Sequence, residues 1–157
     1  MKKIAKFEKV SFNQYSEFGS KETYDQILLP KRATLGSAGY DFFAPDDIEL
    51  SPNETIKVAT GIRVKIEDGW VLQIFPRSSL GFKYRLTLNN TVGIIDSDYY
   101  HSDNEGHIFI KMTNLGDKPL SLKKGQGFAQ GIFTEFGITV DDDATTVRNG
   151  GFGSTNK

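Results

Sequence analysis

The clearest structural signal in this chain is the stretch Ile56–Ile66, which reads IKVATGIRVKI. Its large apolar residues occupy even-numbered positions, whereas the charged residues Lys57, Arg63 and Lys65 occupy odd-numbered ones. Successive side chains of a β-strand point to opposite faces, so this period of two is typical of a half-buried strand. We therefore expect one strand here, or a pair of strands around Gly61.

The same alternation recurs further along the chain, between clusters of turn-forming residues. The alternating segments are Trp70–Ile74, Ile108–Met112 and Leu120–Leu122, and a mostly apolar run follows at Phe128–Phe133. Gly, Pro, Asn and Asp are concentrated between them, as in Asn114–Pro119. Short strands separated by such turns about every ten residues are typical of an all-β sandwich or barrel.

Signals for helices are few. The sequence has no long amphipathic helical stripe, and the best candidate for a short helix is Ser78–Arg85, after Pro76. Residues 11–32 have no clean period, and we expect them to be mostly irregular. The acidic run 141–143 is typical of a solvated turn, and the glycine-rich residues 148–157 are expected to be mobile.

Length and composition exclude several classes of protein. The 157 residues correspond to about one domain, and no linker or repeat is evident. Charged residues make up 25% with a net charge of −1, which disfavours disorder and general nucleic-acid binding. The chain has no Cys and two His, which excludes disulfides and a multi-histidine metal centre. Charges interrupt every apolar stretch before the ~18 residues of a membrane helix, so we expect a cytoplasmic protein without nucleic-acid or membrane partners.

Two segments carry groups that suit phosphates. Pro76–Gly81 places a cation and two hydroxyls directly after a predicted strand, although a capped short helix would look the same. Arg148–Thr155 combines glycines, hydroxyls and Phe152. Its backbone amides could wrap a phosphate and its ring could stack on a base, while a flexible tail is the alternative.

Two further segments place carboxylates beside apolar residues. Asn89–Tyr99 ends with Asp96 and Asp98, which would face the same side of an extended chain. Such a pair is consistent with general-base catalysis or with binding of metal-bound water, and also with a polar strand end. Asp41 lies in an apolar run and needs a partner if it is buried.

Taken together and in this order, these segments resemble the five motifs of the trimeric, all-β dUTPases, enzymes that hydrolyse dUTP to dUMP and pyrophosphate. The resemblance implies a distorted jelly-roll-like β-barrel of short strands with at most one short helix. It also implies a single dUTPase-like domain over residues 1–157, in which 148–157 form a mobile C-terminal arm. The matching segments are Ala38–Asp41, Pro76–Gly81, Gly93–Tyr99, Gly125–Gln130 and Gly150–Thr155, with Arg148 before the last.

The resemblance also implies a role for each matching residue. Asp96 would orient and deprotonate the attacking water, and Asp41 would hold a water of a Mg²⁺ ion that is bound mainly by the triphosphate. The residues implied to bind uracil and deoxyribose are Asn90, Gly93, Ile94, Ile95, Tyr99 and Phe152. Those implied to bind phosphates are Arg77, Ser78, Ser79, Gln130, Arg148, Gly153, Ser154 and Thr155. The implied assembly is a homotrimer with active sites at subunit interfaces.

The sequence departs from the family pattern in three places. Tyr100–Asn104 is an insertion, expected to be a surface loop that could bind a regulatory partner. Gly127 stands where the fourth motif usually has Arg, which removes an ion pair, and the spacing from Arg148 to Gly150 is one residue short.

Two other functions are compatible with the same resemblance. One is a dCTP deaminase of the same broad fold, which needs a differently placed catalytic Glu and lacks the glycine-rich arm. The other is a dUTP-dependent regulatory binding protein. For the hydrolase, the expected role is to limit uracil incorporation into DNA and to supply dUMP for dTMP synthesis.

Overall fold

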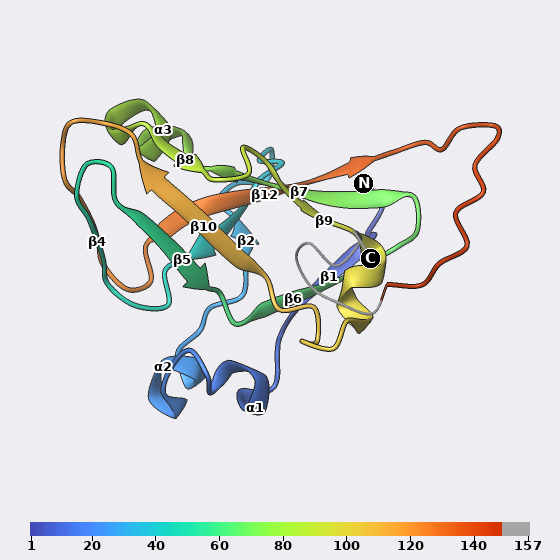
Figure 1. Ribbon diagram of the computed structural model, residues 1–157, viewed down its shortest axis with the longest axis horizontal. Helices are drawn as coiled ribbons and strands as arrows, with labels where there is room; N and C mark the ends of the chain where they lie inside the picture. Colours follow the sequence, from blue (N-terminus) through green and yellow to red (C-terminus); the bar gives the residue numbers. More distant parts are fainter. Residues whose placement is uncertain (149–157) are drawn as a thin grey trace.

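The computed structural model describes residues 1–148, which form twelve strands, three short α-helices and one 3₁₀ helix (Figure 1). The helices are α1 (Phe12–Tyr15), α2 (Lys21–Asp25), α3 (Ser78–Tyr84) and the 3₁₀ helix η1 (Ser97–His101). The strands are β1 (Ala5–Lys9), β2 (Lys31–Arg32), β3 (Tyr40–Phe43), β4 (Ile48–Leu50), β5 (Thr55–Ala59), β6 (Ile62–Ile66), β7 (Trp70–Pro76), β8 (Leu86–Leu88), β9 (Gly93–Ile95), β10 (Phe109–Asn114), β11 (Leu120–Leu122) and β12 (Gly127–Glu135).

The described strands pair antiparallel in four small sheets. The largest has the order β2-β3-β12-β7-β9, and a second has the order β5-β10-β8. Two-stranded sheets are formed by β1 with β6 and by β4 with β11. Because β12 lies between β3 and β7, the predicted motif segments 38–41, 76–81 and 125–130 become neighbours.

The strands predicted from the alternating pattern are confirmed. The stretch Ile56–Ile66 contains β5 and β6, and Val58, Ile62 and Val64 are buried. Gly61, which separates the two strands, has φ +71°, and a Cβ there would collide with the side chain of Ile27. Glycine adopts this left-handed conformation without steric cost, so the chain can turn tightly between β5 and β6.

The core lies between the sheets and is built from the same alternating residues. Leu72, Ile74, Ile110, Met112 and Phe128 are at most 1% exposed. Each such side chain stabilises the fold by about 1.5–3 kcal/mol relative to an exposed position. The predicted mostly-β fold of short strands is therefore present in the described residues.

The prediction of at most one short helix was wrong. The predicted helix at 78–85 is α3, but α1 and α2 lie within residues 11–32, which were expected to be irregular. Ser11 accepts a hydrogen bond from the Gln14 amide and Ser20 accepts one from the Thr23 amide, so each helix has a side-chain N-cap. Helices of four and five residues are too short to show a 3.6-residue period.

The C-terminal part of the chain leaves the sheets after β12. Residues 141–143 are exposed, as expected for a solvated turn. The prediction of a mobile arm over 148–157 falls almost entirely outside the described residues. None of the helices formed by residues 1–148 is long and apolar enough to cross a membrane.

Candidate active site

Asp41, Arg77 and Gln130 come from three different strands or strand ends and meet at one place. Gln130 on β12 is paired with Asp41 on β3 and with Phe75 on β7. The Nε of Arg77 lies 3.2 Å from the Oδ1 of Asp41, and the Nε2 of Gln130 donates to the Pro76 carbonyl at 3.2 Å. The first, second and fourth predicted motifs therefore form one polar group, and the largely buried Asp41 has the partner that it was expected to need.

Ser78 and Ser79 extend this polar group onto the surface. Both are exposed at the start of α3, where Arg77 occupies the N-cap position without a side-chain capping bond. The alternative of a side-chain-capped helix therefore does not explain the segment. Beside it lies a hollow of about 540 Å³, lined by Phe75, Pro76, Arg77, Ser78, Gly81, Phe82, Gln130 and Ile132. A guanidinium and a hydroxyl that line a hollow, with a second exposed hydroxyl on the next residue, can bind an anion such as a phosphate.

Gly127 makes room for the Arg77 side chain. A Cβ at position 127 would lie 2.9 Å from Nη1 and 3.1 Å from Cδ of Arg77. The Nη1 also points at the Gly127 carbonyl, at 3.5 Å. The Arg77 side chain that occupies this space is the one that pairs with Asp41.

The predicted nucleobase segment is a tight turn followed by an edge strand. Thr91 in the turn has φ +63°, and the Val92 amide donates to the Asn90 carbonyl at 2.7 Å. β9 pairs only with β7 among the described strands, so one row of its backbone amides and carbonyls is unpaired. Ile94 is 48% exposed, whereas Ile95 is 2% exposed and can offer a ligand only its backbone.

Gly93 lies on β9 directly opposite Ile74 of the neighbouring core strand β7. A Cβ there would lie 3.1 Å from the Cβ of Ile74, which is tighter than ordinary van der Waals contact. The glycine therefore allows the close approach of β9 to β7.

Asp96 and Asp98 do not lie on one extended strand, contrary to the expectation. Asp96 is the N-cap residue of η1, and Asp98 is in the first turn of that helix. Both carboxylates nevertheless contact one guanidinium. The Nη2 of Arg148 lies 2.6 Å from Asp96 Oδ2, and its Nε lies 3.0 Å from Asp98 Oδ1.

Tyr99 belongs to the core of the single chain. It is 3% exposed, and its hydroxyl donates to the His107 carbonyl at 2.6 Å and accepts from Asn104 Nδ2 at 2.9 Å. Burial raises the pKa of this hydroxyl above its usual value. Its role beside a deoxyribose stays a prediction. Phe152, Gly153, Ser154 and Thr155 lie outside the described residues.

The insertion Tyr100–Asn104 is only partly a surface loop. His101 and Asp103 are exposed, but Ser102 is 5% exposed and Asn104 is bonded to Tyr99. Tyr100 and His101 complete η1. Most of the insertion is thus part of the fold rather than a free loop.

Sequence reasoning missed the structural role of His107. This side chain is fully buried; its Nε2 accepts from the Gly61 amide at 2.9 Å, and its Nδ1 lies 2.8 Å from Gln14 Oε1. Burial lowers the pKa of His107 to about 4, despite the nearby Glu105 charge. In the sequence, His107 merely precedes the alternating stretch Ile108–Met112, and that position does not reveal a partner 93 residues away.

Aromatic rings surround the imidazole of His107. The ring of Phe109 lies 4.3 Å from the His107 ring, centroid to centroid, and Phe18 packs edge-on against both rings. These contacts keep water away from the imidazole, which is consistent with its lowered pKa.

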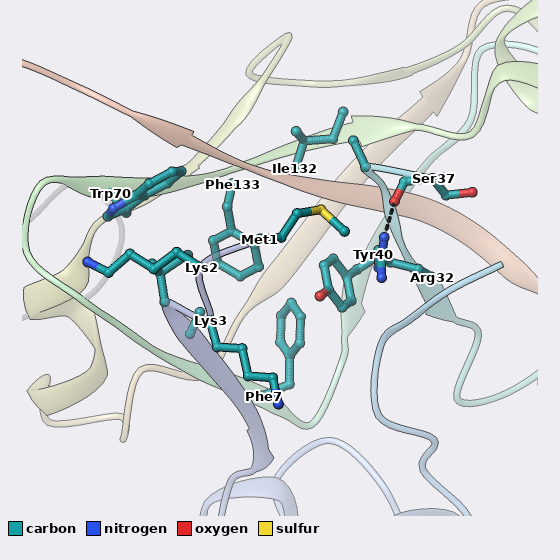
Figure 2. Close-up of a pocket in the computed structure, with 13 residues that line it drawn as sticks. Met1, Lys2, Lys3, Phe7, Arg32, Ser37, Tyr40, Trp70, Ile132 and Phe133 are labelled. Carbon is teal, nitrogen blue, oxygen red and sulfur yellow. Dashed lines mark hydrogen bonds between the residues drawn. The ribbon is translucent and has the colours of Figure 1, made fainter. Parts of the chain in front are cut away.

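A second hollow, of about 720 Å³, lies beside the N-terminal strand (Figure 2). Figure 2 shows the rings of Phe7, Tyr40 and Phe133 gathered along it, with Trp70 at one end. Apart from Ala38 and Tyr40, its lining residues belong to none of the predicted motifs. It is a partly exposed, mainly aromatic surface and is separate from the polar group around Arg77.

The described residues contain no group of three or more His, Asp or Glu side chains that could hold a metal ion. The Oδ1 of Asp41 forms the ion pair with Arg77, whereas its Oδ2 accepts no hydrogen bond from the described residues. A single carboxylate with one free oxygen fits a water molecule of a hydrated Mg²⁺ ion better than the bare ion.

Comparisons with known proteins identify the family. The dUTPase family model matches residues 25–156. The deoxyuridine 5′-triphosphate nucleotidohydrolase of Lactococcus lactis is 42% identical over 132 residues, which cover 82% of this chain and 88% of that protein. The protein of the same name from Escherichia coli O9:H4 is 39% identical over 140 residues, covering 84% and 89%.

Solved structures agree in fold. The dUTPase from Streptococcus mutans superimposes with a TM-score of 0.69 at 38% identity, over 87% of this chain and 98% of that one. The dUTPase from phage phi11 of S. aureus superimposes with a TM-score of 0.67 at 18% identity, over 92% and 97%, and shows the fold alone. The jelly-roll-like β fold expected from the motifs is thereby confirmed, and the chain belongs to the dUTPase family.

Proposed function

We propose that this protein hydrolyses dUTP to dUMP and pyrophosphate, by attack of water on the α-phosphorus. The observation that carries the proposal is the meeting of Asp41, Arg77 and Gln130, which come from segments far apart in the sequence. Relatives that share about two fifths of their residues with this chain are named for the same reaction. The reaction limits uracil incorporation into DNA and supplies dUMP for dTMP synthesis.

The phosphate chain is bound by the polar group at the start of α3. The guanidinium of Arg77 is a planar donor that offsets negative charge, and the hydroxyls of Ser78 and Ser79 add short neutral hydrogen bonds. Gln130 lies next to them through its bond to the Pro76 carbonyl. The C-terminal arm is proposed to close over the terminal phosphate through Arg148, Gly153, Ser154 and Thr155. Its Phe152 ring is proposed to stack on uracil.

Asp96 is the proposed general base. Its carboxylate is 45% exposed at the N-cap of η1, so it can accept a proton from a water molecule beside the α-phosphorus. The leaving pyrophosphate carries away the electron pair of the broken bond. Most of the acceleration must come from positioning and charge neutralisation, as in phosphoryl transfer generally.

Uracil is proposed to bind at the turn and edge strand formed by Asn90, Gly93, Ile94 and Ile95. β9 is paired on one side only among the described strands, so its free backbone groups would donate to and accept from the edge of the uracil base. Cytosine presents the opposite pattern and would leave polar groups unpaired, which can discriminate by a factor of ~10⁴–10⁵.

The proposed active site needs more than one chain. Ile95 is paired with Leu72 in antiparallel strands, so Asp96 lies opposite Val71 of β7. Arg77 follows the end of β7, six residues after Val71. At ~3.3 Å per residue this separation is about 20 Å, too far for both residues to reach one α-phosphate. Figure 1 likewise shows α3 well apart from the yellow helix η1. The separation therefore supports active sites between subunits, and from the family resemblance we propose that the assembly is a homotrimer.

Exposed apolar surface supports this assembly. After β12, Phe136, Ile138 and Val140 are 50%, 75% and 108% exposed, and they alternate as in a strand that lacks a partner. β1 pairs only with β6 among the described strands, and the aromatic hollow of Figure 2 lies beside it. Apolar surfaces of this kind mark protein interfaces.

Mg²⁺ is the proposed cofactor. The triphosphate would supply most of its ligands, and Asp41 would bind one of its waters. When bound, the ion neutralises charge on the phosphates. One solved relative, a variant of the phage phi11 dUTPase, coordinates a structural Mg(II) ion.

Release of pyrophosphate from dUTP, dCTP, dTTP and UTP, with and without Mg²⁺, tests the proposal. We expect release from dUTP alone. Release from none of the four, together with tight dUTP binding, would support the regulatory binding protein, which the named relatives do not favour. Release of ammonia from dCTP would support the deaminase.

A further inference from the structure

A polar cluster outside the proposed substrate contacts joins β1, β6 and the insertion. We call it the Arg63 cluster, and its members are Glu8, Ser11, Arg63, Tyr100 and Glu105. Arg63 on β6 lies directly across from Glu8 on β1. Glu8 and Ser11 precede residue 25, where the match to the family model begins, and Tyr100 opens the insertion. The cluster therefore joins two segments that the family motifs do not include.

Arg63 holds Tyr100 through both its backbone and its ring. The Nη2 of Arg63 donates to the Tyr100 carbonyl at 2.8 Å, and its Cζ lies 3.6 Å from the centre of the Tyr100 ring. A guanidinium is planar, so it can stack on a ring and donate to a carbonyl at the same time. The Arg63 side chain is only 19% exposed, so these contacts are largely shielded from water.

The remaining members fix the two ends of this arrangement. The Tyr100 hydroxyl donates to Glu8 Oε2 at 2.7 Å. Glu105 lies 3.9 Å from Arg63 and accepts hydrogen bonds from the amide and the hydroxyl of Ser11, at 2.9 and 2.5 Å. Tyr100 is thus held by groups on β1 and β6, and Arg63 is in turn tied to the N-terminal segment through Glu105.

Tyr100 is close in the chain to the proposed base. It lies in η1, whose N-cap residue is Asp96, and η1 packs against β6. A 3₁₀ helix of five residues has weak internal hydrogen bonds, so its geometry depends on outside contacts. Ile95, paired with Leu72, fixes the chain on one side of Asp96, and Tyr100 fixes it on the other.

We propose that Arg63 is a positioning residue for hydrolysis, which sets the place of Asp96 by holding η1 through Tyr100. This inference rests on the proposed function, because Asp96 is the base of that reaction. Arg63 is not among the residues proposed to contact the substrate or the reacting atoms. A misplacement of a reacting group by about 1 Å can lower the rate by ~10², which sets the size of the expected effect.

The test compares Arg63→Ala, Arg63→Lys and Tyr100→Phe with the wild-type protein. We expect Arg63→Ala to lower kcat by about 10–100-fold, while the Kd of a non-hydrolysable dUTP analogue stays within about threefold. Lysine cannot stack and donate as the guanidinium does, so Arg63→Lys should lose most of the same activity. Tyr100→Phe keeps the ring and the carbonyl and should stay within about threefold.

A matched control separates positioning from stability. Val58→Ala removes buried atoms from β5, which pairs with β10 and not with β1 or β6, and lowers Tm without touching the cluster. Hydrogen exchange of segment 96–102 should accelerate in Arg63→Ala and not in Val58→Ala. Unchanged kcat in Arg63→Ala, or an equal loss in Val58→Ala, would overturn the inference. An inactive wild-type protein would contradict the proposed function instead. Even then, unchanged hydrogen exchange of segment 96–102 in Arg63→Ala would contradict the proposal that Arg63 holds η1 in place.

Discussion

Arg148 forms an ion pair with Asp96, in which the Nη2 of Arg148 lies 2.6 Å from the Oδ2 of Asp96. The same guanidinium reaches Asp98 through Nε at 3.0 Å. The residue proposed to bind the terminal phosphate therefore contacts the residue proposed to be the base. A triphosphate carries more negative charge than the two carboxylates together, so it competes with Asp96 and Asp98 for the guanidinium.

Asp96→Asn should remove turnover and leave dUTP binding nearly intact. The amide cannot accept the proton from water, and we expect kcat to fall by at least about 10²–10³. Steady-state kinetics and calorimetric titration with dUTP measure the two effects separately. Asp98→Asn is the matched control, because it removes the same charge from the same partner two residues away. Near-normal turnover in Asp96→Asn would end the assignment of the base.

Arg148→Ala should weaken catalysis without unfolding the protein. Ion pairs between partly exposed groups contribute about 0–1 kcal/mol, so Tm should change by only a few degrees. If Arg148 moves to the phosphates, kcat/KM for dUTP should fall by about tenfold or more. Melting curves and kinetics on the same preparation check both parts. A large loss of Tm with normal kcat/KM would show that the contact with Asp96 is purely structural.

The sequence predicted the strands well because their burial alternates locally, as in Val58, Ile62 and Val64. It did not predict α1 and α2, because helices this short are specified by caps rather than by periodicity. The motifs placed Asp41, Arg77 and Gln130 in one site, and the structure brings these three together. The arrangement around Arg63 and Tyr100 was not predictable, because it depends on a pairing between distant segments.

Gly127→Ala should disturb phosphate binding through Arg77. The added methyl group would lie 2.9 Å from Arg77 Nη1, so the Arg77 side chain must shift, which disturbs its ion pair with Asp41. We expect KM for dUTP to rise by about 3–10-fold with a smaller change in kcat, because the contact that is lost stabilises the bound substrate and the transition state equally. Gly36→Ala is the control, since a Cβ there meets nothing within 4 Å. Equal KM values in the two variants would show that the room beside Arg77 does not matter.

The buried His107 should make the fold less stable in mild acid. Its pKa is lowered to about 4 in the fold, against ~6.5 in the unfolded chain, so the unfolded chain binds the proton more readily. The stability due to neutral His107 is therefore complete above pH ~6.5 and is lost as pH falls towards 4, by up to about 3 kcal/mol. Urea unfolding at a series of pH values measures this slope. His107→Gln cannot take up this proton, so its free energy of unfolding should fall less steeply between pH ~6.5 and 4 than that of the wild-type protein. Equal slopes for the two proteins would show that His107 does not cause the loss of stability in acid.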